Sequence, residues 1–211
     1  DSPSCGMERV KVYTDKGMPG GRGAGAYAQE IMAALPLLPV EEEGRLGDPV
    51  LRENFIQRVF VYDRWQRLIE AGLTPGALVD FHTRHKFILL AHDEPTYREI
   101  GHWIADAGKT DINALGERYI SALMTALKKK ASRKRHTNVL MHLMGFLKQN
   151  LDADDKAELV ETIEAYRQEQ VPLVVPITLL RHHFRRHPDP YVQDQYYLDP
   201  HPRELKLRNM L

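Results

Sequence analysis

The only cysteine among the 211 residues, Cys5, lies in a short motif that can expose reactive groups. In the segment Ser2-Pro3-Ser4-Cys5-Gly6, the thiol stands between a turn-forming proline and a conformationally free glycine, so its sulfur and the neighbouring backbone N–H groups can meet a ligand. A single thiolate builds neither a zinc site nor an iron–sulfur cluster, because these need three or four ligands. Two interpretations stay open: Cys5 is a metal ligand whose co-ligands are histidines, carboxylates or groups from outside the chain, or it is an ordinary thiol.

Histidines fall on the apolar face of a helix that we expect from Pro75 onward. His85 and His92 lie on an apolar stripe, with His82 and Lys86 beside them, because residues three and four apart share a helix face. Such imidazoles are either buried and hydrogen-bonded or line a polar pocket inside a helical bundle. His82 and His85 also have the spacing of a metal pair on one helix, but no third ligand stands out.

A second polar pair, Asn138 and His142, lies at the edge of the apolar stripe of a later helix. Buried polar groups need partners, since an unpaired one costs about 1–3 kcal/mol. We therefore expect this helix to pack so that the pair meets His85 in one interior site, with nearby basic residues supplying charge. Without a cysteine or an obvious carboxylate, such a site suits an anion or a polar base better than zinc. The residues expected at this pocket are His82, His85, Lys86, Asn138, His142 and Arg181.

Six of the eight residues from 128 to 135 are basic. They lie at the C-terminal end of an expected helix, and this end favours cations through the helix dipole, so a solvated helix end explains them without a ligand. Alternatively, they contact the phosphates of RNA or DNA. Against that, the formal net charge of the chain is zero and no aromatic residues alternate with the basic ones. The candidate nucleic-acid contacts are Lys128, Lys129, Lys130, Arg133, Lys134 and Arg135.

Helical patterns dominate the chain after residue 48. Asp48-Pro49 and Thr74-Pro75 each combine a capping residue with proline at the first helical position, which marks two helix starts. Apolar residues then recur with the helical period in successive segments. The expected helices span residues 49–72, 75–91, 96–107, 112–130, 136–149, 153–169 and 177–187, and the chain from residue 188 is expected to be irregular.

The first part of the chain combines strand, loop and helix signals instead of a continuous helical pattern. We expect a short strand at residues 9–13, a glycine-rich loop at 17–25 and a helix at 24–35 that Pro36 stops. The glycine spacing fits neither a dinucleotide fingerprint nor a P-loop, so the loop is either a tight turn or an anion site at a helix N-terminus. The patterns predict a mainly α protein: a bundle-like helical domain at residues 74–211, preceded by a truncated α/β segment with a linking helix at 1–73.

The composition is that of an ordinary globular protein. Lys plus Arg and Asp plus Glu both number 29, and 43% of residues are hydrophobic, which excludes a globally basic nucleic-acid coat and an acidic disordered tail. No apolar run approaches the ~20 residues of a membrane span, and no basic and apolar leader opens the chain. We therefore expect a cytoplasmic protein without a membrane partner, whose oligomeric state the sequence does not indicate.

Several long motifs resemble known families. Residues 78–209 resemble the YbgA-like domain of unknown function, number 1722 in its series, through the segments 81–86 (FHTRHK), 136–145 (HTNVLMHLMG), 195–200 (QYYLDP) and 204–209 (ELKLRN). Residues 1 to about 66 resemble the C-terminal part of another family, number 523, that includes thiouracil desulfidases, through the segments 2–6 (SPSCG), 38–46 (LPVEEEGRL) and 52–55 (RENF). The two domains are commonly fused in this order.

The second resemblance implies iron–sulfur chemistry. Desulfidases of this type hold a [4Fe–4S] cluster on three cysteines, and the iron without a protein ligand takes sulfur from a thiolated pyrimidine. By this resemblance Cys5 is the third cysteine ligand and Ser2 polarises the substrate. The other two cysteines would lie upstream in a full-length parent, so this chain, as a truncated piece, is expected to hold no cluster and to be inactive alone. The alternative is a non-enzymatic module that binds nucleic acid or a protein.

Overall fold

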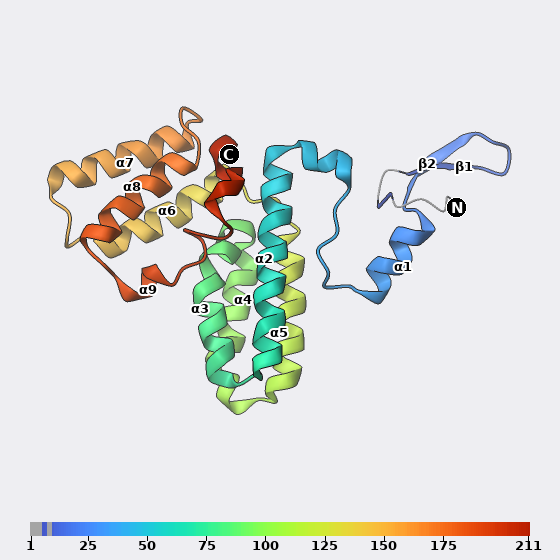
Figure 1. Cartoon of the computed structure of the whole chain (residues 1–211), viewed down its shortest axis with the longest axis horizontal. Coiled ribbons are helices and arrows are strands. Elements are labelled where there is room, and N and C mark those ends of the chain that lie inside the picture. Colours follow the sequence, from blue (N-terminus) through green and yellow to red (C-terminus); the bar gives the residue numbers. More distant parts are fainter. Residues whose placement is uncertain (1–5, 8–9) are drawn as a thin grey trace.

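The N-terminal part is a small hairpin followed by a helix. The structure, a computed structural model, describes residues 6–7 and 10–211. Strands β1 (Val10–Tyr13) and β2 (Pro19–Gly23) pair antiparallel, and helix α1 (Ala26–Ala34) comes after them (Figure 1). The expected strand and helix are confirmed, but part of the expected glycine-rich loop is a strand. Strand pairing uses backbone groups, which glycine possesses like any residue, and Gly17 at φ 73° makes the turn.

The capping signals of the sequence place the two longest helices. Asp48 accepts hydrogen bonds from the backbone N–H groups of Val50 and Leu51, at the start of helix α2 (Pro49–Ala71). Thr74 caps helix α3 (Pro75–His92) in the same way, by accepting from Ala77 N. Gly72, at φ 98°, ends α2 in a conformation that disfavours other residues. Both helix starts are confirmed to the residue.

The helices after α1 form two groups that contact each other (Figure 1). In the first, α2 and α3 pack with two further helices, and α2 thereby joins the core of the domain that comes after it. In the second group, three helices pack on one another, and one of them, α6 (Arg133–Leu147), contacts α3 of the first group. The remaining helices of the two groups are α4 (Glu94–Ala105), α5 (Ile112–Leu127), α6 (Arg133–Leu147), α7 (Ala153–Arg167) and α8 (Val174–Arg186).

Three helix boundaries, on α5, α6 and α8, differ from expectation by three residues. Helix α5 ends at Leu127 and α6 begins at Arg133, capped by the Ser132 side chain, so the basic run is divided between a turn and the first turn of α6. Helix α8 begins two residues before Pro176 instead of after it, because proline is tolerated in the first turn of a helix.

The C-terminal segment is less irregular than expected and is partly buried. It crosses the junction of the two helix groups, where Tyr197 is fully buried and Arg208 is 6% exposed. The backbone N–H of Tyr196 donates to Arg84 O on α3 at 3.0 Å, and Leu173 N donates to Leu211 O at 2.8 Å. The short helices of the chain are η1 (Glu43–Gly47), η2 (Ala107–Lys109), α9 (Pro190–Gln193), η3 (Arg203–Leu205) and η4 (Leu207–Met210).

Within residues 6–7 and 10–211, no helix has the length and apolar character that crossing a membrane requires.

Candidate functional site

Ser2 and Cys5, the two residues whose expected roles rest on the resemblance to desulfidases, lie outside the described residues. Gly6 and Met7, which follow Cys5, form hydrogen bonds with two later parts of the N-terminal segment. The backbone N–H of Met7 donates to Glu42 Oε1 at 2.8 Å, and Gly25 N donates to Gly6 O at 2.7 Å. The segment after Cys5 therefore contacts the Pro-Val-Glu-Glu-Glu segment, 35 residues away in the chain.

The side chains that the structure places do not form a metal site. Within the described ranges, no group of three or more histidine, cysteine or carboxylate side chains is arranged to hold a metal ion. The chain has one cysteine, so its own residues do not fit a cluster that needs three thiolates. Among the described residues, His82 and His85 therefore have no third ligand with which to form a metal site.

The expected histidine stripe on α3 is confirmed as a buried face. His85 Nδ1 donates to Phe81 O at 2.7 Å, and the His85 ring lies between the rings of Phe81 and Tyr196, with centroids at 4.0 and 4.6 Å. Burial lowers the pKa of His85 to about 3. Burial, with the nearby Lys86 charge, lowers the pKa of His82 to about 4. These imidazoles are neutral parts of an aromatic core.

The expected shared pocket does not form, and this prediction is wrong. Asn138 and His142 are exposed, whereas the buried stripe of α6 begins at His136. The helix is rotated relative to expectation, because α3, α7 and α8 cover the face that carries Val139 and Leu143.

Two other expected pocket residues, Arg181 and Lys86, have partners other than His85. Arg181 forms an ion pair with Asp199 and donates to Leu198 O at 2.5 Å. Lys86 lies over the ring of Tyr191, with its Nζ 4.5 Å from the centroid. Both side chains therefore hold the C-terminal part of the domain against α8 and α3.

The basic residues between α5 and α6 mostly have structural partners. Lys129 Nζ lies 2.5 Å from Asp93 Oδ2, and Arg135 Nη1 donates to His92 O at 2.7 Å. Arg133 Nη1 donates to Tyr166 O at 2.9 Å. The two exposed members for which the described chain shows no such partner are Lys128 and Lys134.

The strongest concentration of buried polar groups was not expected from the sequence. Glu53 on α2 is 4% exposed, and its Oε1 accepts from Arg208 Nε at 3.0 Å. Arg208 also donates to Tyr197 O at 2.5 Å, and His201 Nε2 lies 3.5 Å from the same carboxylate oxygen. Burial alone would raise the pKa of Glu53, but the Arg208 charge and the His201 contact lower it to about 2. Glu53 is thus a charged, paired carboxylate in the interior.

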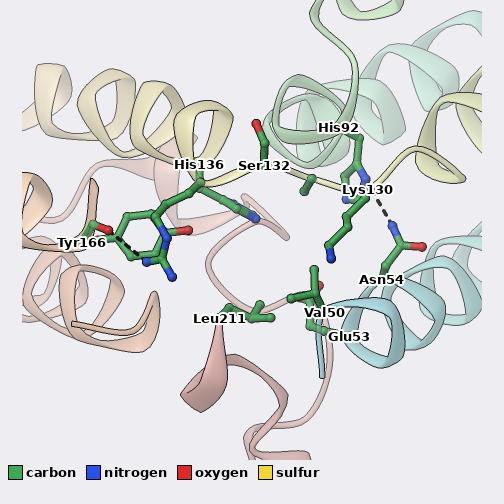
Figure 2. Close-up of a pocket in the computed structure, with 11 residues that line it drawn as sticks. Val50, Glu53, Asn54, His92, Lys130, Ser132, His136, Tyr166 and Leu211 are labelled. Carbon is green, nitrogen blue, oxygen red and sulfur yellow. Dashed lines mark hydrogen bonds between the residues drawn. The ribbon is translucent and has the colours of Figure 1, made fainter. Parts of the chain in front are cut away.

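A second part of this network surrounds His92 at the end of α3. His92 Nδ1 donates to Lys129 O at 2.6 Å, and its Nε2 lies 2.7 Å from Gln57 Oε1. Asn54 Nδ2 donates to Leu127 O at 2.9 Å. The same nitrogen lies 3.3 Å from His92 Nδ1 (Figure 2). Burial lowers the pKa of His92, which favours the neutral ring. The polar face of α2 thereby fixes the ends of α3 and α5.

These polar groups border a cavity of about 290 Å³ between α2, the turn before α6 and the C-terminal residue (Figure 2). Its polar lining comes from elements far apart in the sequence, and its apolar lining includes Val50, Ala131 and Leu211. The polar and charged residues at the cavity are Glu53, Asn54, His92, Lys130, Ser132, Arg133, His136 and Tyr166.

Comparison with known proteins agrees with the helical part of this architecture. The model of the family described as "Protein of unknown function (DUF1722)" matches residues 86–202, more than half of the chain. The chain belongs to this family. It is also 34% identical, over 158 residues, to the "Uncharacterized protein YbgA" of Escherichia coli (strain K12), a match that covers 74% of this chain and 94% of that protein. No solved structure matches it significantly.

The YbgA-like domain therefore carries the cavity and most of its lining. These two matches do not test the resemblance of the N-terminal segment to desulfidases, which stays a prediction. The one sequence signal for the polar network was the run Glu53, Asn54, Gln57 and Arg58, whose helical spacing continues the buried stripe of Val61. Arg208, which pairs with Glu53, lies 155 residues away in the sequence, so no local pattern predicts this pair.

Proposed function

We propose that the full-length protein removes sulfur from a thiolated pyrimidine or a similar small molecule with the help of a [4Fe–4S] cluster. In this proposal Cys5 is one of three cluster ligands and Ser2 polarises the substrate. The support is the resemblance of the segments at 2–6, 38–46 and 52–55 to desulfidases. Because the chain contains one cysteine, two further ligands must come from residues outside these 211.

The observation that carries this proposal is the contact between the two motif segments. The carboxylate of Glu42 accepts the Met7 N–H at 2.8 Å, two residues after Cys5. The neighbouring Glu41 pairs with Arg45 at 2.7 Å, and its second oxygen lies 3.9 Å from Arg58 on α2. A carboxylate that holds the backbone N–H two residues after a cysteine ligand would orient the cysteine loop, as a ligand loop requires.

We expect the 211-residue chain, reconstituted anaerobically with iron and sulfide, to bind no stable cluster, because one thiolate replaces at most one of three. In the full-length protein, Cys5→Ala should abolish the visible absorption of the cluster. Ser2→Ala is the matched control: it should keep iron and sulfide content but lower the release of sulfide from 2-thiouracil. Full cluster content in the Cys5→Ala parent would remove Cys5 from the ligand set.

A second candidate function, a nucleic-acid-binding module, rests on the exposed side chains of Lys128 and Lys134. If these contact phosphates, affinity for RNA should fall with salt by a log–log slope of about 0.7–0.9 per contact. The double change Lys128→Glu and Lys134→Glu should then lower both affinity and slope while the fold stays intact, since the ion pairs of the other basic residues remain. Binding that is absent at low salt would leave these lysines as a solvated helix end.

A further inference from the structure

The cavity at the junction of the two helix groups is faced by a histidine nitrogen for which the described chain shows no hydrogen-bond partner. His136 is 6% exposed, and its Nδ1 lies 2.9 Å from the Tyr197 hydroxyl. No hydrogen bond in the described chain uses its other nitrogen, Nε2, and Figure 2 shows the ring directed into the cavity. A buried ring nitrogen that faces open space marks a place for a ligand atom.

The proton on His136 can be assigned from Tyr197. The Tyr197 hydroxyl is fully buried, and His136 Nδ1 is the one acceptor that the described residues offer it. A buried hydroxyl left without an acceptor is destabilising, so the Tyr197 hydroxyl donates to Nδ1. Burial, with the Arg208 charge, lowers the pKa of His136 to about 3. The neutral ring therefore carries its single proton on Nε2 and presents a donor to the cavity.

Lys130 adds a positive charge to the same space. In Figure 2 its side chain extends toward the region above Val50 and Leu211, which His136 also faces. Its Nζ lies 3.6 Å from Asp48 Oδ2 at the rim, a half-exposed pair that a stronger anion can replace. The one side-chain carboxylate among the described lining residues, that of Glu53, is neutralised by Arg208.

The first turn of α6 contributes a favourable field. Ser132, Arg133 and His136 all line the cavity, and they form the start of a 15-residue helix whose dipole places positive charge there. The cavity volume, about 290 Å³, lies at the lower end of the ~300–1,000 Å³ usual for ligand sites, so it admits a small group and not a large cofactor.

We propose that this cavity binds a phosphate-type oxyanion, held by Lys130 Nζ, the Nε2–H of His136 and the N-terminal turn of α6. The observations that carry the proposal are the free, inward-facing imidazole donor, the adjacent ammonium group and the absence of an uncompensated side-chain carboxylate among the described lining residues. The site belongs to the YbgA-like domain and is independent of the proposed iron–sulfur chemistry.

The test uses the whole 211-residue chain and inorganic phosphate, followed by calorimetry and by the thermal midpoint of unfolding. Phosphate should bind and raise the midpoint, and Lys130→Gln should weaken binding about tenfold or more, because a hydrogen bond to a charged group contributes about 1.5–3 kcal/mol. Lys134→Gln is the matched control, since it removes the same charge from an exposed position outside the cavity lining. It should leave phosphate affinity within about twofold.

His136 provides a second readout that does not depend on affinity. In ¹⁵N NMR spectra its imidazole should show the neutral form protonated at Nε2, and phosphate should shift that N–H resonance in the unmodified chain. Equal weakening by Lys130→Gln and Lys134→Gln would overturn the proposal, because the effect would be general surface electrostatics. A His136 resonance that phosphate does not move, or one protonated at Nδ1, would overturn it as well.

Two sources of the phosphate group are separated by further arms of the same experiment. A small phosphate monoester that competes with inorganic phosphate supports a free metabolite. Competition by a short oligonucleotide that Lys130→Gln weakens supports a phosphate within a nucleic acid. Oligonucleotide binding that depends on Lys128 and Lys134 but not on Lys130, without binding of inorganic phosphate, excludes the cavity site and leaves only the surface.

Discussion

Glu53→Ala is expected to lower the free energy of unfolding by about 3–5 kcal/mol, the usual cost of removing one partner of a buried ion pair. The change leaves the guanidinium of Arg208, 6% exposed, without its carboxylate, and it removes the contact of His201. Since a domain of this size is commonly stable by about 5–15 kcal/mol, the loss is a large part of the total. Urea unfolding followed by circular dichroism measures it.

The matched control is Glu70→Ala on the same helix. Glu70 is exposed near the end of α2, so its loss should change stability by less than about 0.5 kcal/mol. The double change Glu53→Leu with Arg208→Met removes both charges and should be less destabilising than the sum of the single changes. If the Glu53→Ala chain were as stable as the original, the ion pair between Glu53 and Arg208 would contribute nothing to the free energy of unfolding.

Local signals in the sequence were sufficient to predict most helices. Asp48-Pro49 and Thr74-Pro75 determine their helix starts through side-chain oxygens and a fixed proline φ, which act within about three residues. The buried stripe of α3, with His85 and His92, follows from the helical period in the same way. The mainly α architecture could therefore be predicted from the chain alone.

The candidate site could not be predicted, because long-range packing decides it. On α6 both His136 and His142 border apolar positions, and only the placement of α3, α7 and α8 decides that His136 is the buried one. Likewise, Glu53 and Arg208 look like ordinary surface charges until the C-terminal segment crosses α2. Pairs that are distant in sequence leave no periodic pattern, so the cavity becomes visible only in the folded chain.

The last prediction is that the protein loses stability steeply as the pH falls from about 6 to 4. The buried rings of His82, His85 and His136 have pKa values of about 4, 3 and 3, lowered from the ordinary value of 6.5. Below pH 6.5 the unfolded chain therefore binds about three protons that the folded chain does not. Each contributes about 1.4 kcal/mol per pH unit, so stability should fall by roughly 4 kcal/mol per unit in this window.

Two variants separate the histidines from other acid effects in that experiment. His85→Phe keeps an aromatic ring between Phe81 and Tyr196 and should reduce the slope between about pH 6 and 4 by about one third, whereas His142→Gln, at an exposed position, should leave it unchanged. Glu53 acts in a different range: its pKa is lowered from 4.5 to about 2, so its contribution is complete above pH 4.5 and is lost only below it. Stability measured by urea unfolding at each pH gives the slope. A flat profile from about pH 7 to 5 would mean that these imidazoles take up protons in the folded state and are not buried as the structure places them.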